Sequence, residues 1–256
     1  MIRANATIDY VEDLKGKIAL VTGVGRPEGI GAAVCRKLAE EGVDIFYTYW
    51  YKYDIQEYPE TKNPKALLEE LQGFSVRAES MEIDLSQLQA PSELFKEVGE
   101  RLGAPDILIN NACYDRAIPF ESLTADVLDS HYYVNLRAAA MLCVEFVKAW
   151  KKETDGRIIN MTSGQTLGPM NVDQIPYTVT KASLEMLARQ LSPGIIDLGI
   201  TINAVDPGPT DTGWMSKELK EQIRRNSIVN QPQDVAVAIA SLLLSPTTGD
   251  VIHVGR

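Results

Sequence analysis

The chain has 256 residues, of which 45% are hydrophobic and 23% charged, the size and composition of one globular α/β domain. Its formal net charge of -10 argues against a nucleic-acid-binding surface, because such a surface needs clustered Lys and Arg to follow phosphates. No run of 18 apolar residues predicts a membrane span, and the first residues lack the apolar core of a secretory signal. With three isolated cysteines and two histidines, we expect reduced thiols, a cytoplasmic location and no metal site.

Short apolar runs alternate with helical patterns along the chain. We expect strands at residues 18–21, 43–49, 76–83, 106–109, 157–161, 200–205 and 251–254. Helices are expected between them, at residues 30–41, 65–71, 94–102, 124–150, 177–192 and 235–244. Strands that alternate with helices form a parallel sheet covered on both faces. The pattern therefore predicts an α/β fold, a single Rossmann-type doubly wound domain over residues 16–256, with residues 1–15 as an N-terminal arm.

Turn residues follow three of the expected strands, at Thr22-Gly23, Asn110-Asn111 and Asp206-Pro207-Gly208. Ligands of open parallel sheets bind outside the carboxyl ends of the strands. We therefore expect the functional site at the edge where these three turns meet.

The first turn is rich in glycine and lies between a strand and a helix. It places Gly23, Gly25, Gly29, Ile30 and Gly31 where backbone N–H groups can approach a pyrophosphate. Glycine also serves as an ordinary cap or loop residue, so the turn is ambiguous by itself. Its position between strand and helix favours dinucleotide binding. A P-loop ATPase is disfavoured because the turn lacks the Gly-Lys-Ser/Thr ending.

The end of the second strand indicates which dinucleotide is bound. NAD sites place a carboxylate there to hold the ribose 2′-hydroxyl, whereas residues 46–50 of this chain contain none. Arg26, within the glycine turn, can pair with a 2′-phosphate, although it can equally be a solvated loop charge. The criterion favours NADP(H) and leaves NAD(H) open.

Tyr177 and Lys181 are four residues apart in an expected helix, so they lie on one face. An ammonium group near a phenol favours the phenolate and lowers its pKa, which suits acid–base catalysis. The alternative is a partly buried tyrosine beside a surface lysine. The strand at 157–161 delivers Ser163 to the same sheet edge, and Asn135 interrupts an expected helix, where it needs a specific partner.

Together these features resemble the short-chain dehydrogenase/reductase family, from about Leu14 to Val254. Within it the chain is most similar to the β-ketoacyl-acyl-carrier-protein (3-oxoacyl) reductase-like branch. The matching segments, in order, are the glycine turn, Asp84, Asn110-Asn111-Ala112, Asn135, Ser163, Tyr177 with Lys181, residues 203–212 and Pro232-Gln233-Asp234-Val235-Ala236.

The resemblance implies a role for each matching residue. Tyr177 would exchange the proton with the substrate oxygen, Lys181 would lower the Tyr177 pKa and hold the nicotinamide ribose, and Ser163 would orient the substrate. Asn135 would support a water relay that reaches Lys181. The cofactor would be contacted by Asp84 at the adenine, by Asn110 and Ala112 in the cleft, by Pro207 and Gly208, and by Thr210 and Thr212 at the nicotinamide amide. A homo-oligomer, a tetramer or dimer, is implied as well.

Several positions depart from the family pattern. Five residues instead of three separate Gly23 from Gly29-Ile30-Gly31, and Cys113 replaces the usual glycine after Ala112. Pro193 falls where the Tyr177 helix normally continues, so we expect an early end or a kink there. Residues 50–64 are expected to be an extended, aromatic-rich loop without an assigned role, and the usual glycine-rich tail after the last strand is missing.

The leading hypothesis is NADPH-dependent reduction of a ketone or aldehyde, 3-oxoacyl-like, to an alcohol. An alcohol dehydrogenase working in the oxidative direction, a non-catalytic dinucleotide-binding regulator and a nucleotide-binding structural subunit are the alternatives. Residues 212–231 are expected to form a lid over a small-molecule substrate. There Trp214 and Met215 provide either an apolar substrate surface or ordinary packing.

Overall fold

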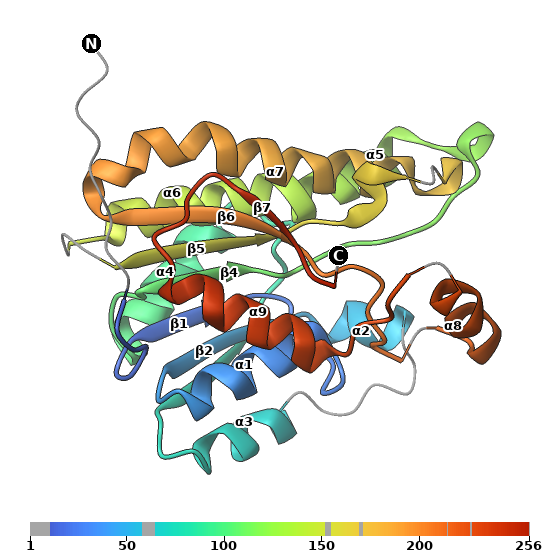
Figure 1. The fold of residues 1–256 in the computed structure, drawn as a ribbon. Helices are drawn as coiled ribbons and strands as arrows, with labels where there is room; N and C mark the ends of the chain where they lie inside the picture. Colours follow the sequence, from blue (N-terminus) through green and yellow to red (C-terminus); the bar gives the residue numbers. More distant parts are fainter. Residues whose placement is uncertain are drawn as a thin grey trace.

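The computed structural model describes residues 11–57, 65–151, 155–168, 171–213, 215–225 and 227–255. These residues form a seven-stranded parallel sheet with the order β3-β2-β1-β4-β5-β6-β7 (Figure 1). The strands are β1 (Ile18–Val21), β2 (Asp44–Tyr49), β3 (Ala78–Glu82), β4 (Ile107–Asn110), β5 (Gly156–Met161), β6 (Ile200–Asp206) and β7 (Val251–His253). The expected Rossmann-type α/β fold and its seven parallel strands are confirmed. The strand order reverses between β1 and β4, and such a switch point opens a ligand crevice at the carboxyl edge.

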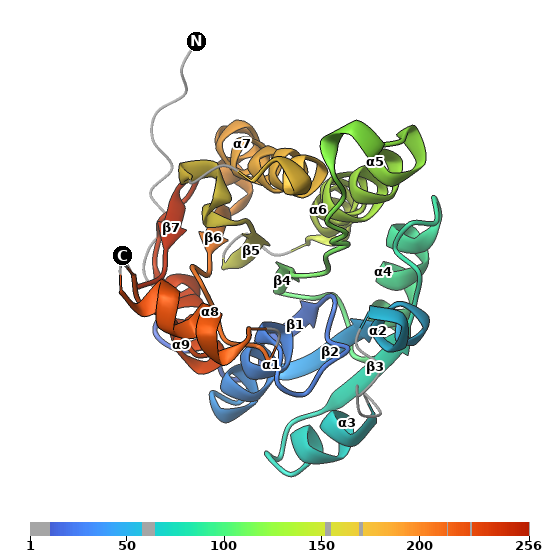
Figure 2. The same cartoon turned by 90° about the vertical axis from the view of Figure 1, so that its right-hand side faces the viewer.

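Two hydrophobic clusters cover the two faces of the sheet. Figure 2 shows the helices on both sides of the sheet. One cluster packs α1 (Ile30–Glu40), α3 (Lys65–Gln72) and α9 (Pro232–Leu244) against the sheet, and the other packs α4 (Ala90–Arg101), α6 (Ala139–Ala149) and α7 (Ile175–Ile195). Successive side chains of β1 alternate between the clusters, Ala19 in the first and Leu20 in the second. Within the described ranges, no helix is long and apolar enough to cross a bilayer.

Two short helices stand where the sequence predicted loop or lid. Residues 51–57 form α2 (Tyr51–Glu57), so the expectation of an extended loop is wrong there; residues 58–64 lie outside the described residues. The expected lid contains α8 (Lys217–Arg224), whose first turn is capped by the Ser216 hydroxyl accepting from the N–H of Leu219 at 3.2 Å; Trp214 lies outside the described residues. Neither helix has a buried residue, and therefore neither shows the apolar pattern of a core helix.

The expected arm is described only from Val11 onward. There the N–H of Val11 donates to the carbonyl of Leu244 at 3.0 Å, and Leu14 is buried. Residues 11–15 therefore pack on the domain, while residues 1–10 lie outside the described residues.

The long helix expected at residues 124–150 consists of three segments. It begins with α5 (Ala125–His131), continues as a π-helical segment (Tyr132–Ala138) and ends with α6. A π-helical segment inside an α-helix frequently marks a functional site, and this one carries Asn135.

Helix α7 continues past Pro193 to Ile195, so the expected early end is wrong. A proline in a helix removes the hydrogen bond to the carbonyl four residues earlier, here that of Arg189. The Ser192 hydroxyl donates to this carbonyl at 3.4 Å and replaces part of the lost bond. The proline lies two residues from the helix end, where few backbone bonds remain to be broken.

Candidate active site

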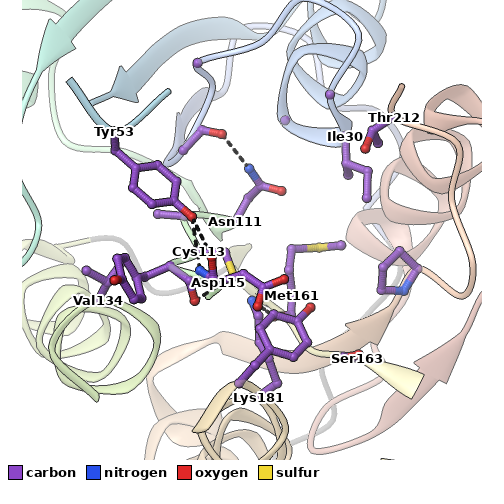
Figure 3. A pocket seen from close by; sticks show the side chains of 18 of the residues that line it. Ile30, Tyr53, Asn111, Cys113, Asp115, Val134, Met161, Ser163, Lys181 and Thr212 are labelled. Carbon is purple, nitrogen blue, oxygen red and sulfur yellow. Dashed lines mark hydrogen bonds between the residues drawn. The ribbon is translucent and has the colours of Figure 1, made fainter. Parts of the chain in front are cut away.

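A cavity of about 1060 Å³ opens at the carboxyl edge of the sheet, where the turns after β1, β4 and β6 meet (Figure 3). This volume lies at the upper end of small-molecule sites, about 300–1,000 Å³. The wall contains nearly every residue that the sequence assigned to the site: Gly23, Gly25, Arg26, Gly29, Ile30, Gly31, Asp84, Ala112, Ser163, Tyr177, Lys181, Pro207, Gly208, Thr210 and Thr212. Asn110 and Asn135 do not line it.

The glycine turn is fixed to the end of β4 by a set of hydrogen bonds. The Asn111 amide donates to the carbonyls of Thr22 at 2.9 Å and Gly23 at 3.0 Å. The Thr22 hydroxyl in turn accepts from the N–H groups of Asn111 and Ala112. Gly23 has a φ of +72°, and a Cβ there would lie 2.4 Å from the Cα of Ala112. Only glycine fits this close approach.

The N-terminus of α1 faces the cavity without a side-chain cap. Gly29 is the N-cap residue, no side chain accepts from the first N–H groups, and the first turn carries no acidic residue. Unpartnered N–H groups at a helix N-terminus favour an anion. The site therefore fits the pyrophosphate of a dinucleotide. The two additional residues of the turn are accommodated because the N–H of Gly29 donates to the carbonyl of Arg26 at 3.0 Å.

Arg26 spans the cavity mouth to the residues after β6. Its guanidinium donates to the carbonyl of Thr212 at 3.2 Å and lies 3.5 Å from the Thr212 hydroxyl. The guanidinium is thus a link between the glycine turn and the expected lid, a contact that the sequence did not indicate.

Asp54 brings a carboxylate to the same half of the cavity, although the sequence suggested none at the end of β2. It lies on α2, and a Cβ at Gly25 would be 1.8 Å from its Oδ2 atom. Burial raises the Asp54 pKa to about 6, the Arg26 charge lowers it and the Glu82 charge raises it. Sequence reasoning missed Asp54 because it assigned α2 to an extended loop.

Asp84 follows β3 at the expected adenine end. Its carboxylate accepts from the N–H of Ser86 at 2.9 Å and from the Gln87 amide at 3.0 Å. Burial opposes ionisation, but these bonds and the charge of Lys52 outweigh it and lower the Asp84 pKa. Lys52, on α2, joins Arg26 and Lys181 as a basic residue of the cavity wall, and the sequence did not single it out.

Tyr177 and Ser163 meet in the cavity wall opposite the glycine turn. Burial raises the Tyr177 pKa well above its ordinary value of 10, and the charges of Cys113, Asp115 and Asp206 raise it further. A hydrogen bond with the Ser163 side chain acts in the other direction. The phenol is therefore protonated at neutral pH, which suits a proton donor.

Lys181 lies on the same face of α7 as Tyr177, as the spacing predicted. Its ammonium group is buried and donates to the carbonyl of Met161 at 2.7 Å. Burial has the largest effect on the Tyr177 pKa, and the net shift is upward. That Lys181 acts against this shift stays a prediction.

Asn135 is buried behind the cavity wall in the π-helical segment. Its amide oxygen accepts from the N–H of Tyr114 at 2.7 Å, and its amide nitrogen donates to the carbonyl of Tyr114 at 2.9 Å and to the Thr180 hydroxyl at 3.1 Å. These are the specific partners that an asparagine inside a helix requires. Asn135 thereby fixes the segment after β4.

Asn110 was expected to line the cofactor cleft, but its side chain lies inside the sheet. The amide donates to the Oδ1 atom of Asn160 on β5 at 2.8 Å. It ties β4 to β5 below the cavity, and Asn111 and Ala112 take the positions at the wall.

Comparison with known proteins places this site in a family. The family model described as short chain dehydrogenase matches residues 17–223. The chain belongs to the short-chain dehydrogenase family. It is thus an oxidoreductase with the Rossmann-type fold of that family, as the sequence predicted.

Two relatives cover nearly the whole chain. The "Uncharacterized oxidoreductase YjdA" of Bacillus subtilis (strain 168) is 41% identical over 93% of this chain and 94% of the relative. The 3-oxoacyl-[acyl-carrier-protein] reductase FabG of Aquifex aeolicus is 31% identical over 94% of this chain and 96% of the relative.

Two similar solved structures contain a cofactor. A short chain dehydrogenase from Burkholderia cenocepacia in complex with NADP has a TM-score of 0.84 and 28% identity, covering 95% of this chain and 98% of that one. The angucycline C-6 ketoreductase LanV with bound NADP has a TM-score of 0.82 and 29% identity, covering 96% of each chain.

Proposed function

We propose that the protein reduces a ketone or aldehyde to an alcohol with NADPH, and that Tyr177 donates the proton. The observation that carries this proposal is the protonated, Ser163-bonded phenol of Tyr177 in the same cavity as the uncapped N-terminus of α1. When bound, NADPH supplies the hydride. The chain supplies the anion site, the proton and the orientation of the carbonyl.

Each side chain has a defined task in this proposal. The hydroxyls of Ser163 and Tyr177 bind the substrate oxygen, and Tyr177 transfers its proton to that oxygen as the carbonyl is reduced. Lys181, on the same face of α7 as Tyr177, brings an ammonium group to the same cavity wall, where it stabilises negative charge that develops on the phenol oxygen. Its ammonium is held by the Met161 carbonyl, so its position is set before substrate binds.

NADPH is proposed as the cofactor on two grounds. The similar structures from Burkholderia cenocepacia and of LanV carry NADP. Arg26 and Lys52 add positive charge to the wall of this cavity, which favours a 2′-phosphate. The Asp54 carboxylate acts in the opposite direction, since it lies against Gly25 and repels an anion.

A 3-oxoacyl thioester is a second candidate substrate, favoured by the similarity to the FabG reductases. The oxidative direction remains an alternative, because the same phenol can accept a proton from an alcohol once it is ionised. A non-catalytic regulator is disfavoured, because a protein that only binds a dinucleotide has no need of the Tyr177 and Ser163 pair.

We also propose a homo-oligomer. Large apolar side chains are exposed on the outer faces of α6 and α7, namely Met141, Val144, Val179 and Met186. Exposed apolar patches often mark interfaces between subunits. Light scattering after size-exclusion chromatography measures the state directly, with a monomer as the contradicting result.

The reductase proposal is tested by a panel of ketones and aldehydes, including acetoacetyl-coenzyme A, with NADPH and NADH in parallel. Oxidation of the cofactor is followed by its absorbance. We expect turnover that is faster with NADPH. A preference for NADH would contradict the cofactor argument from Arg26 and Lys52. NADPH binding without turnover of any carbonyl would favour the regulator.

A further inference from the structure

Two hydrogen-bond acceptors in the cavity wall lack a partner. Among the described residues, five buried side-chain N and O atoms have none, and two of them, Oδ1 of Asp115 and Oε1 of Gln174, belong to residues that line the cavity. The other three belong to Asn110, Asn160 and Arg157, away from its wall. A shielded acceptor without a donor is unfavourable, because it has lost its water and gained no hydrogen bond. A ligand that brings donors to this wall removes that cost.

The position of Asp115 is set by its backbone. The Tyr53 hydroxyl accepts from the N–H of Asp115 at 3.1 Å and donates to its carbonyl at 3.3 Å. The preceding residue, Tyr114, is held on both sides by the Asn135 amide. Figure 3 shows Tyr53, Asp115 and Lys181 around the same hollow. The carboxylate is therefore carried by a fixed segment, as a recognition residue needs to be.

In the described part of the chain, the Asp115 carboxylate forms no ion pair. The charge of Lys181 lowers the Asp115 pKa, but the Lys181 ammonium donates its hydrogen bond to the Met161 carbonyl. Both ring nitrogens of His131 face backbone groups: its Nδ1 lies 2.8 Å from the Val127 carbonyl, and its Nε2 lies 3.3 Å from the backbone nitrogen of Arg116.

The Asp115 pKa is also shifted. Burial raises the Asp115 pKa most, while the charge of His131, a hydrogen bond from the Gln174 side chain and the charge of Lys181 lower it, and the charge of Glu57 raises it. The net direction is upward, as expected for a carboxylate that lacks a close counter-ion.

Asp115 is also close to the reacting groups. Its charge contributes to the raised pKa of Tyr177, and Gln174 precedes Tyr177 by three residues at the start of α7. When a substrate carbonyl binds at Tyr177 and Ser163, the rest of that molecule therefore lies in the cavity that the acceptors of Asp115 and Gln174 also line.

We propose that Asp115, assisted by Gln174, binds a hydroxyl or ammonium group of the substrate while Tyr177 and Ser163 bind its carbonyl oxygen. The substrate class is then a hydroxylated or aminated ketone or aldehyde, in preference to a plain alkyl ketone or an acyl chain. This inference rests on the proposed reductase function. A site built around acceptors discriminates strongly against analogues that lack the donor, since the acceptors stay unpaired.

The test uses ketones matched in size with wild-type protein and NADPH. Hydroxyacetone and aminoacetone are compared with butan-2-one, and 4-hydroxybutan-2-one with pentan-2-one. We expect wild type to favour the donor-bearing member of each set in kcat/KM. In Asp115→Asn the ratio between donor-bearing and alkyl ketone should fall by about 10- to 100-fold, most for aminoacetone, because hydrogen bonds to charged groups are the strong ones. Gln174→Met should lower the ratio in the same direction by a smaller factor.

The ratio within each variant separates recognition from general damage and from the intrinsic reactivity of the hydroxyketones. Asp126→Asn removes the same charge from an exposed site on α5 outside the cavity and should leave the ratio unchanged. No preference in wild type, or a preference that Asp115→Asn retains, overturns the inference. The reductase proposal stands in that case, provided that turnover depends on Tyr177. Absence of Tyr177-dependent turnover with every ketone overturns both.

Discussion

The Asp54 carboxylate is half-buried, and its ionisation works against the folded state. Burial raises its pKa from the ordinary 3.8 to about 6. Because the folded pKa lies above the unfolded one, the protonated acid favours folding at low pH. This contribution falls as pH rises from 3.8 to about 6 and is lost above that. Two pKa units correspond to about 3 kcal/mol for a fully desolvated group, which solvent screening of a half-buried carboxylate reduces to about 1 kcal/mol.

Asp54→Asn removes the charge and keeps the shape of the side chain. By urea denaturation, we expect its free energy of unfolding to exceed that of wild type by about 1 kcal/mol at pH 7.5 and to match it near pH 4. Glu69→Gln, at an exposed site on α3, should show no such pH dependence. A gain of equal size at both pH values would refute the reasoning, because it would arise from packing and not from ionisation.

Three further outcomes are expected. Asn135→Ala removes three hydrogen bonds from a buried amide and should lower the free energy of unfolding by about 3 kcal/mol in urea, whereas the exposed Asn171→Ala should cost less than about 1 kcal/mol. Gly23→Ala should lower the free energy of unfolding by about 2 kcal/mol or more and should abolish NADPH binding, measured by fluorescence. Gly99→Ala, within α4 and with open space at its Cβ, should instead raise the free energy of unfolding by up to about 1 kcal/mol. Reduction should continue undiminished up to about pH 9, because the raised pKa keeps the Tyr177 phenol protonated; an alkaline limb centred near pH 7–8 in kcat/KM would contradict this.

The sequence predicted the elements that have a buried face. Apolar runs such as residues 18–21 and 106–109 indicate strands covered on both sides, and all seven strands were found in this way. Helices α2 and α8 were missed because neither buries a residue, although Ser216 ahead of α8 is a cap that could have been recognised. Of the early end or kink expected at Pro193, the early end does not occur, because the Ser192 hydroxyl and the nearby helix end limit the cost.

The site residues on strand ends and helix starts were placed well, since the topology alone brings Gly23, Ser163 and Tyr177 to one edge. The residues that depend on the path of a loop were not foreseen. Asp54 and Asp115 reach the cavity through α2 and through the segment after β4, and their positions depend on contacts between residues distant in sequence. The upward shift of the Tyr177 pKa was likewise hidden, because burial is a property of the folded chain.

Turnover by Tyr177→Phe tests the account most directly. The variant lacks only the phenol oxygen, and Tyr132→Phe, on the exposed face of the π-helical segment, is its matched control. With any ketone that wild type reduces, we expect Tyr177→Phe to bind NADPH normally while kcat falls by about 100- to 10,000-fold. Wild-type turnover by this variant would contradict the role assigned to the tyrosine and with it the proposed reductase.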